Sequence, residues 1–223
     1  TMIWTCFFSF SVGKYTHQIV IGMELTGERL MCGRYHIDNA VMDEIEKVVH
    51  DIGANIHRQE AGDVYPSQTA IVLTGKKTGL YAGEMTWGFP QYHQKGLLIN
   101  ARAETVLERR TFWDSVRHRR CIIPAGHFYE WDSSKNKVTF YKKDKSVLYM
   151  AGFYSRFEDG NRFIIITTQA NASVAQVHDR MPLILEEKEL ESWVYDDNFL
   201  DFALHKTPVE LQRCQEYEQL SLF

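Results

Sequence analysis

The chain has 223 residues, 44% of them hydrophobic, and a formal net charge of −4 at pH 7. These values are those of an ordinary globular domain with a full-sized core, and they exclude an intrinsically disordered chain. Ten acidic and three basic residues lie between Ile184 and Phe223, which leaves +3 for the rest of the chain. The acidic C-terminal part thus masks a mildly basic body that can carry a nucleic-acid surface.

The cysteine and glycine patterns argue against several common classes of site. The four cysteines are far apart and form no C-x-x-C pair, which disfavours a disulfide framework and a structural zinc site. The motifs H-E-x-x-H, G-x-x-x-x-G-K-[ST] and G-x-G-x-x-G are all missing from the sequence. We therefore expect no metal and no cofactor, and a protein of the reducing cytoplasm.

Residues 1–30 are expected to be an N-terminal extension of a single domain that spans residues 31–223. The apolar stretch from Met2 to Val12 is too short to span a bilayer and lacks the basic leader and cleavage site of a secretory signal. Three interpretations of residues 1–30 remain: a translated upstream region or tag ahead of a start at Met31, a pro-segment, or an extra strand. We favour the first.

The predicted elements begin with one clear helix. Asp38 or Asn39 can cap it, apolar residues from Val41 to Ile52 follow at helical spacing, and Gly53 ends it. Shorter helices are predicted for 111–118, capped by Thr111, for a segment starting at Asn171 or Ser173, and for 186–195. Between them lie short apolar or alternating runs that predict strands at 70–74, 80–87, 97–100, 121–123, 128–131, 138–141, 147–154, 162–168 and 182–185.

Because helices are few and fall irregularly between the strands, a doubly wound parallel sheet is improbable. The pattern favours an α+β, β-rich domain with a curved, mostly antiparallel sheet and a few short helices. The densest basic run has the plainest interpretation as a solvated helix face and consists of Arg109, Arg110, Arg117, Arg119 and Arg120.

A distinctive chemistry is available at Met31-Cys32-Gly33-Arg34. A cysteine with a free α-amine carries an amine and a thiol on adjacent carbons. The amine can condense with an aldehyde to an imine, and the thiol can then close a stable thiazolidine ring. An α-amine has a pKa of about 7.7 to 8.0, so much of it is in the neutral, attacking form at cellular pH. If the residues before Cys32 stay attached, its nitrogen is an amide and this reaction is closed.

Three further stretches combine polar or ionisable groups with glycine, proline or aromatic neighbours at strand ends: Asn100-Ala101-Arg102-Ala103-Glu104, Phe128-Tyr129-Glu130-Trp131 and His178-Asp179-Arg180-Met181-Pro182. Each alone is a weak signal. In this order, together with M-C-G-R, they resemble the SOS-response-associated peptidase (SRAP) family, which crosslinks itself to abasic sites in single-stranded DNA. The resemblance runs from Met31 to about Glu187.

The resemblance implies roles for four catalytic residues. Cys32 traps the aldehyde of the abasic sugar, and Glu130 assists proton transfer at the amine and at ring opening. His178 acts at the sugar hydroxyl and ring oxygen, and Asn100 positions the N-terminal residue and the sugar. A carboxyl group and an imidazole suit such proton transfer, and burial between two aromatic neighbours would raise the pKa of Glu130.

The resemblance also implies DNA contacts. Arg34 and Arg102 match motif arginines that bind phosphates beside the lesion, and Arg180 is a third candidate. Trp87, in the family's W-G element, is expected either to stack on a base or to be a core aromatic. The expected partner is single-stranded DNA with abasic sites, alone or at a junction with a duplex. The protein is expected to be a monomer that does not engage membranes and joins the nucleoid on damaged DNA.

Three stretches depart from the family pattern. After Trp87-Gly88 the chain reads Phe89-Pro90-Gln91-Tyr92, so a second aromatic platform is in question. Gly126-His127 replaces an Asp-Gly pair before F-Y-E-W. The stretch Tyr65-Pro66-Ser67 matches the family's proline loop only loosely.

Three functions remain open on the sequence alone. The first is an abasic-site sensor that forms a thiazolidine crosslink through Cys32, with associated lyase-type activity. The second is a cysteine-type peptidase in which Cys32 attacks a carbonyl with His178 or Glu130 as base, most sensibly to remove the residues before Cys32. The third is a noncovalent DNA-binding module in which Cys32 is merely buried.

Overall fold

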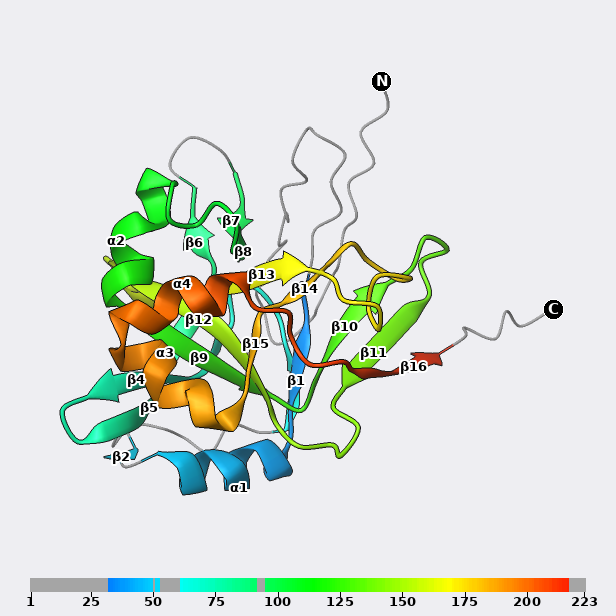
Figure 1. Cartoon of the computed structure of the whole chain (residues 1–223), viewed down its shortest axis with the longest axis horizontal. Helices are drawn as coiled ribbons and strands as arrows, with labels where there is room; N and C mark the ends of the chain where they lie inside the picture. Colours follow the sequence, from blue (N-terminus) through cyan, green and yellow to red (C-terminus); the bar gives the residue numbers. More distant parts are fainter. Residues whose placement is uncertain (1–31, 50, 53–60, 92–94, 217–223) are drawn as a thin grey trace, which may run out of the picture.

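Two mostly antiparallel sheets form the body of the protein in a computed structural model that describes residues 32–49, 51–52, 61–91 and 95–216 (Figure 1). The smaller sheet has the order β16 (Gln212–Glu216), β11 (Lys137–Tyr141), β10 (His127–Trp131), β1 (Tyr35–Ile37), β3 (Gly62–Val64). The larger sheet has the order β14 (Arg180–Pro182), β13 (Gly160–Gln169), β12 (Leu148–Phe157), β9 (Arg120–Ala125), β4 (Thr69–Lys76), β5 (Gly79–Trp87), β2 (Asp51–Ile52).

The larger sheet curls until it closes on itself. Strand β13 pairs with β12 along most of its length and also pairs in parallel with β5, at Arg162 with Thr86 and Phe163 with Trp87. Two short strands extend the curl, β8 (Asn100–Arg102) beside β13 and β15 (Ile184–Leu185) beside β12, while β6 (Phe89–Pro90) and β7 (Leu97–Leu98) form a small ribbon. The expected curved, mostly antiparallel sheet is confirmed.

The larger sheet, closed on itself, forms a barrel. Apolar side chains that point inward from its strands fill the interior, as the apolar runs in the sequence predict. The central strands β9, β12 and β13 are buried on both faces over much of their length, because helices cover them outside. Helices α3 (Leu190–Tyr195) and α4 (Asp197–His205) lie together along one side of the sheet, and α2 (Arg110–His118) lies at its upper end in Figure 1. Among the described segments, each helix is too short or too polar to span a lipid bilayer.

Helix boundaries differ from the sequence expectation in physical detail. Helix α1 (Asn39–Val48) is capped by Asp38, whose side chain accepts the Val41 N–H, but it ends at Val49 and leaves Ile52 to strand β2. Helix α2 starts after Arg109, so Thr111 lies inside the helix instead of capping it. The apolar spacing runs on to Ile52, but there the backbone pairs with β5 instead. Helix α2 begins without a side-chain cap, so Thr111 does not mark its start.

The C-terminal half holds further differences. Residues 172–177 form consecutive turns instead of the helix expected after Asn171. The predicted helix 186–195 begins as a 3₁₀ turn, η1 (Glu187–Glu189), within a capping box from Glu186, before α3 continues it. Strands β1, β3 and β16 were not predicted, because strands this short carry too little periodicity. Helix α4 was also not predicted.

The basic run is only partly a solvated face. Arg109, Arg110 and Arg117 are exposed on or beside α2. Arg120 is 4% exposed, and its guanidinium donates to the carbonyls of Trp193 and Arg117 and to Asp197. Arg120 therefore joins β9 to the helices α3 and α4, which is a structural role that the sequence expectation did not include.

The tight centre of the barrel predicts that Gly152→Ala is strongly destabilising. A Cβ at Gly152 would lie 2.5 Å from the Ile164 carbonyl oxygen and would collide with Ile123. Since the obstacle includes backbone, we expect a loss of about 1 to 3 kcal/mol in the free energy of unfolding, measured by urea denaturation. Gly33→Ala is the matched control, because nothing lies within 4 Å of its added Cβ; equal losses for the two variants would contradict the packing described here.

Candidate active site

The nitrogen of Cys32 is bound directly by the Glu130 carboxylate. Cys32 lies just before β1, and β1 pairs antiparallel with β10 so that Tyr35 faces Phe128. This register brings the start of β1 to Glu130, and the Cys32 N–H donates to Glu130 Oε1 at 2.6 Å. Cys32 is fully buried and Glu130 is 2% exposed. Two residues that are 98 positions apart in sequence thus form one buried acid–nitrogen pair.

The thiol of Cys32 is held in its neutral form. Burial, and to a smaller extent the negative charge of Glu130, raise the pKa of the Cys32 thiol well above its ordinary value. The thiol is therefore a poor nucleophile at neutral pH until a neighbour takes its proton. Cys32 also has a φ of 44°, in the left-handed region that side chains with a Cβ rarely adopt. Strain of this kind costs on the order of 1 to 3 kcal/mol and clusters at functional positions.

The other candidate residues gather around the C-terminal end of β13. Thr167 on β13 is paired on one side with Arg102 of β8 and on the other with Pro182 of β14. Asn100 begins β8, and Arg102 ends it with an exposed side chain. His178 ends the turns that lead into β14, and it is 6% exposed.

The backbone selects a proton arrangement for His178. Its Nδ1 accepts the Arg180 backbone N–H at 3.0 Å and lies 2.9 Å from the carboxylate of Asp179. These contacts compete, since Nδ1 can accept only when it carries no proton and can bind the carboxylate only when it does. The Asp179 side chain is 87% exposed, so its ion pair is weak, whereas the Arg180 amide is fixed by the strand and is the stronger partner of Nδ1. The neutral ring then carries its proton on Nε2.

Arg180 is engaged by the protein itself. Its guanidinium donates two parallel bonds to the Glu104 carboxylate, at 2.7 and 2.8 Å, and a third to the Thr167 carbonyl oxygen at 2.8 Å. Burial alone would raise the pKa of Glu104, but the Arg180 bonds outweigh it and lower that pKa. Arg180 is therefore placed to join β14 to the segment after β8, and the phosphate contact expected for it has a resident competitor.

Core aromatics connect the two groups of candidate residues. The Tyr35 ring lies 5.2 Å from the Trp87 ring, and the Trp87 indole donates to the carbonyl oxygen of Ile99, next to Asn100. Trp87 also stacks on Phe163 and is fully buried. Of the two roles expected for Trp87, the structure gives it the core one. The ring is fully buried in the absence of DNA, and its stacking on a base stays a prediction.

Arg34 lies in an aromatic cage beside the Cys32 and Glu130 pair. Its guanidinium lies over the rings of Tyr65 and Trp131, each 4.9 Å away, and of Tyr129 at 5.4 Å. Its Nη1 forms an ion pair with the Asp63 carboxylate at 3.6 Å. The arginine is thus held in place by stacking, at the surface of the smaller sheet.

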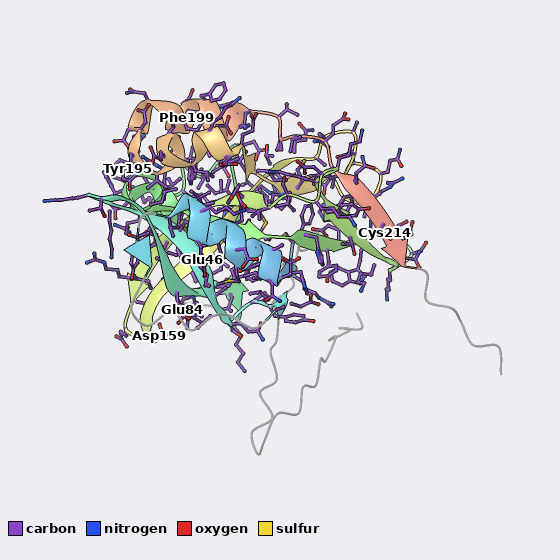
Figure 2. All side chains as sticks on the ribbon, turned by 90° about the horizontal axis from the view of Figure 1, so that it is seen from below. Glu46, Glu84, Asp159, Tyr195, Phe199 and Cys214 are labelled. Carbon is purple, nitrogen blue, oxygen red and sulfur yellow. The ribbon has the colours of Figure 1, made fainter. Side chains whose placement is uncertain are left out.

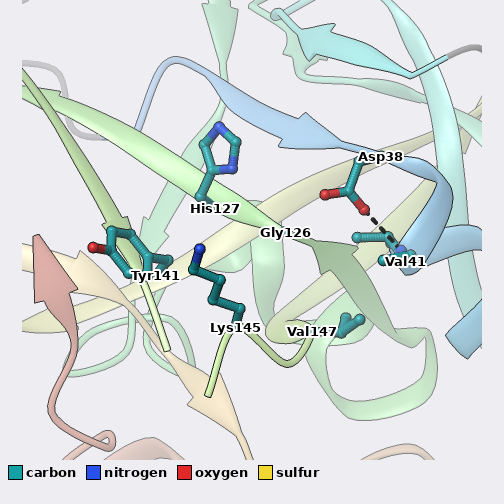
Figure 3. A pocket seen from close by; sticks show the side chains of 8 residues that line it. Asp38, Val41, Gly126, His127, Tyr141, Lys145 and Val147 are labelled. Atoms are coloured by element: carbon teal, nitrogen blue, oxygen red, sulfur yellow. Dashed lines mark hydrogen bonds between the residues drawn. The ribbon is translucent and has the colours of Figure 1, made fainter. Parts of the chain in front are cut away.

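A separate hollow lies between the start of α1 and the loop from β11 to β12. It measures about 330 Å³ and is lined by polar groups that include Asp38, His127, Tyr141 and Lys145 (Figure 3). None of the candidate catalytic residues lines it. Within the described ranges, groups of three or more histidine, cysteine or acidic side chains placed to hold a metal ion are absent.

The site combines a β-rich domain with a buried cysteine whose nitrogen is hydrogen-bonded to a buried glutamate. This combination is the feature to compare with known families. The profile of one family, SOS response associated peptidase (SRAP), matches residues 31–218. The chain belongs to the SRAP family. Relatives include the abasic site processing protein YoaM of Bacillus subtilis, which is 32% identical over 75% of this chain and 81% of YoaM. The abasic site processing protein YoqW of Bacillus subtilis is also 32% identical, over 86% of this chain and 93% of YoqW. The abasic site processing protein YedK of Escherichia coli is 28% identical, over 74% of this chain and 79% of its own.

Solved structures share the fold. A crystal structure of a protein from Bordetella bronchiseptica superposes with a TM-score of 0.69 at 21% identity, covering 84% of this chain and all of the other. One from Bacteroides thetaiotaomicron gives a TM-score of 0.66 at 21% identity, covering 82% and 91%. At this identity the likeness establishes the architecture.

Sequence reasoning missed the partners of Arg34 and Arg180. Asp63 and Glu104 reach these arginines through strand register and a turn, which no local pattern reveals. For Arg34 the departures from the family pattern were a signal, since Tyr65 lies against its guanidinium and His127 contacts Tyr129 beside it.

Burial of the thiols predicts their order of reactivity. With iodoacetamide at pH 8, Cys214, which is exposed on β16 (Figure 2), is expected to be alkylated first, while Cys32 and Cys121 stay protected. Burial also raises the pKa of Cys121, so neither inner thiol offers a thiolate. Peptide mapping by mass spectrometry reads out each site. Alkylation of Cys32 as fast as that of Cys214 in the folded full chain would contradict the buried site.

Proposed function

We propose that the protein processes abasic sites in single-stranded DNA by forming a covalent crosslink through Cys32. The observation that carries the proposal is the 2.6 Å hydrogen bond from the Cys32 nitrogen to Glu130. A buried carboxylate costs stability unless it is paired, so Glu130 is a costly way to satisfy one backbone N–H. It is what the condensation of an amine with an aldehyde requires.

The reaction balances with the groups present once Cys32 has a free amine. The amine adds to the aldehyde carbon of the open sugar, and Glu130 carries the two protons of the amine, one after the other, from nitrogen to the former carbonyl oxygen, which leaves as water. The imine that remains has no proton on nitrogen. The Cys32 sulfur then bonds to the imine carbon, and the thiol proton ends on nitrogen. The product is a thiazolidine. An imine that escapes ring closure permits elimination at the sugar, which is the lyase-type side activity.

His178 and Asn100 are proposed to serve the sugar. With its proton on Nε2, His178 is a donor suited to the ring oxygen of the closed sugar, whose opening liberates the aldehyde. Asn100 begins β8, and its neighbour Ile99 is tied to Trp87, so its amide is held on a rigid strand. An amide can donate to the sugar and accept from the cysteine at once.

Arg34 and Arg102 are proposed to bind phosphates flanking the lesion. Arg102 is exposed at the end of β8. Arg34 lies among aromatic rings, and its guanidinium donates no hydrogen bond within the described residues, which leaves it able to bind an anion. The partner is single-stranded DNA, alone or at a junction with a duplex, and the protein acts as a cytoplasmic monomer on damaged DNA. Arg180 and Trp87 are not assigned to DNA, because Glu104 and the core hold them.

Crosslinking requires that the residues before Cys32 be removed, and two features favour such processing. The left-handed φ of Cys32 is defined by the preceding peptide bond, so the strain disappears when that bond is hydrolysed. Glu130 also lies on the nitrogen that leaves in the hydrolysis, where a proton is needed. Water is the co-reactant, and the Cys32 thiol is the candidate nucleophile. This is the autopeptidase form of the activity.

Glu130→Gln is predicted to slow crosslinking by about 100-fold, since the amide keeps the shape but cannot carry the proton. The substrate is a uracil-containing oligonucleotide treated with uracil glycosylase, and the heat-stable adduct is measured on a denaturing gel with a chain that begins at Cys32. Glu84→Gln is the matched control, because Glu84 is an exposed acid on β5 (Figure 2). A wild-type chain that binds this DNA in a salt-dependent way but forms no adduct would instead favour the noncovalent module.

Intact-mass measurement tests the processing. Freshly expressed full chain is expected to lose the residues before Cys32, and both Cys32→Ala and Glu130→Ala are expected to retain them. Cys214→Ala is the control, since this thiol is exposed and distant in sequence from the site. Equal processing of wild type and the Cys32 and Glu130 variants would show that the cleavage is not the protein's own.

A further inference from the structure

The Arg34 side chain is an incompletely satisfied cation. Within the described residues its guanidinium donates no hydrogen bond, and its Nε is buried without a partner. Its side chain is 19% exposed, and the Asp63 carboxylate, 26% exposed, faces Nη1 at 3.6 Å, which is beyond hydrogen-bond length. A guanidinium has five N–H donors, and in this arrangement Asp63 neutralises the cation through its charge without accepting a hydrogen bond from it.

Asp63 is fixed from its other side. Its Oδ1 accepts the Tyr129 hydroxyl at 2.9 Å and lies 2.8 Å from His36 Nδ1. Because the Tyr129 proton goes to Asp63, the contact of 2.8 Å between His127 Nε2 and the Tyr129 oxygen requires the histidine to donate. The rings of His36 and His127 stack 4.5 Å apart, which completes the cluster.

The cluster keeps Asp63 ionised. Burial would raise the pKa of the Asp63 carboxyl, but the bonds from His36 and Tyr129 and the charge of Arg34 outweigh it and lower that pKa. The carboxylate is therefore a permanent negative charge at neutral pH. It stands next to the cation that the proposed function assigns to a DNA phosphate.

We propose that Asp63 is a specificity-determining residue: its carboxylate is the resident counter-ion of Arg34, and a DNA phosphate must compete with it for the guanidinium. The inference rests on the proposed function. It makes binding of intact single-stranded DNA weak, because each encounter is opposed by a fixed negative charge. A lesion that reacts with Cys32 is then retained by the covalent bond, whereas undamaged DNA is released.

Asp63→Asn tests the competition, since an amide oxygen can keep the bonds from Tyr129 and His36 while the charge is lost. Binding of a fluorescein-labelled undamaged oligonucleotide to the full chain, measured by anisotropy, is expected to tighten by about five-fold or more. The slope of log Kd against log salt is expected to steepen by about 0.7, the value for one more phosphate contact on a single strand. Asp63→Ser, which removes the carboxylate through a smaller side chain, must give the same direction.

Two controls separate this effect from net charge. Asp159→Asn removes an exposed carboxylate that pairs with Arg162 on the hairpin between β12 and β13 (Figure 2), so it changes the net charge equally. In an Arg34→Gln background, the effect of Asp63→Asn is expected to fall to that of Asp159→Asn.

Equal effects of Asp63→Asn and Asp159→Asn, or a full effect of Asp63→Asn without Arg34, would overturn the inference. Adduct formation by the wild-type chain, freed of the residues before Cys32, is assayed in parallel on abasic DNA. If that adduct forms while Asp63→Asn changes nothing, only the role of Asp63 fails. If no adduct forms, the proposed function itself fails.

Discussion

The hydrogen bond between the Cys32 nitrogen and the Glu130 carboxylate depends on the pairing of β1 with β10, and the rest of the site is arranged around it. A shift of one residue in that register would turn Glu130 to the opposite face of the sheet. The same pairing carries Arg34 to the rings of Tyr129 and Trp131. The register of one strand pair therefore places the Cys32 nitrogen, the Glu130 carboxylate and the Arg34 guanidinium next to one another.

The closed barrel supplies the second half of the site. Strand β13 holds β8 and β14 on either side of Thr167, so Asn100, Arg102 and His178 come from a rigid framework. The contact of Tyr35 with Trp87 and the bond from Trp87 to Ile99 tie this framework to β1. Buried aromatics thus fix the relation between the two sheets, which explains why Trp87 serves the core. Sites built on strands in this way are more precise than sites built on loops.

Much of this could be predicted from the sequence, for definite reasons. Long strands such as β5, β12 and β13 carry long apolar runs that stand out in the sequence, and the motif around Glu130 places a carboxylate on a strand. Short strands such as β1 and β3 have no such signal, and the pairing of His36 with Asp63 exists only through their register. For the same reason the Arg180 and Glu104 pair was missed. The choice between the two roles expected for Trp87 depends on how deeply the ring is buried. The alternation of apolar and polar residues in the sequence does not show that depth.

In the proposed crosslink both the nitrogen and the sulfur of Cys32 bond to the lesion, and Glu130 lies at the nitrogen. A crystal structure of the chain beginning at Cys32, after reaction with an abasic single strand, tests this most directly. We predict a five-membered ring that contains the Cys32 nitrogen and sulfur and the former aldehyde carbon, with a Glu130 oxygen within hydrogen-bond distance of the ring nitrogen. A link through sulfur alone, a link through a lysine, or a Glu130 carboxylate turned away from the nitrogen would contradict it.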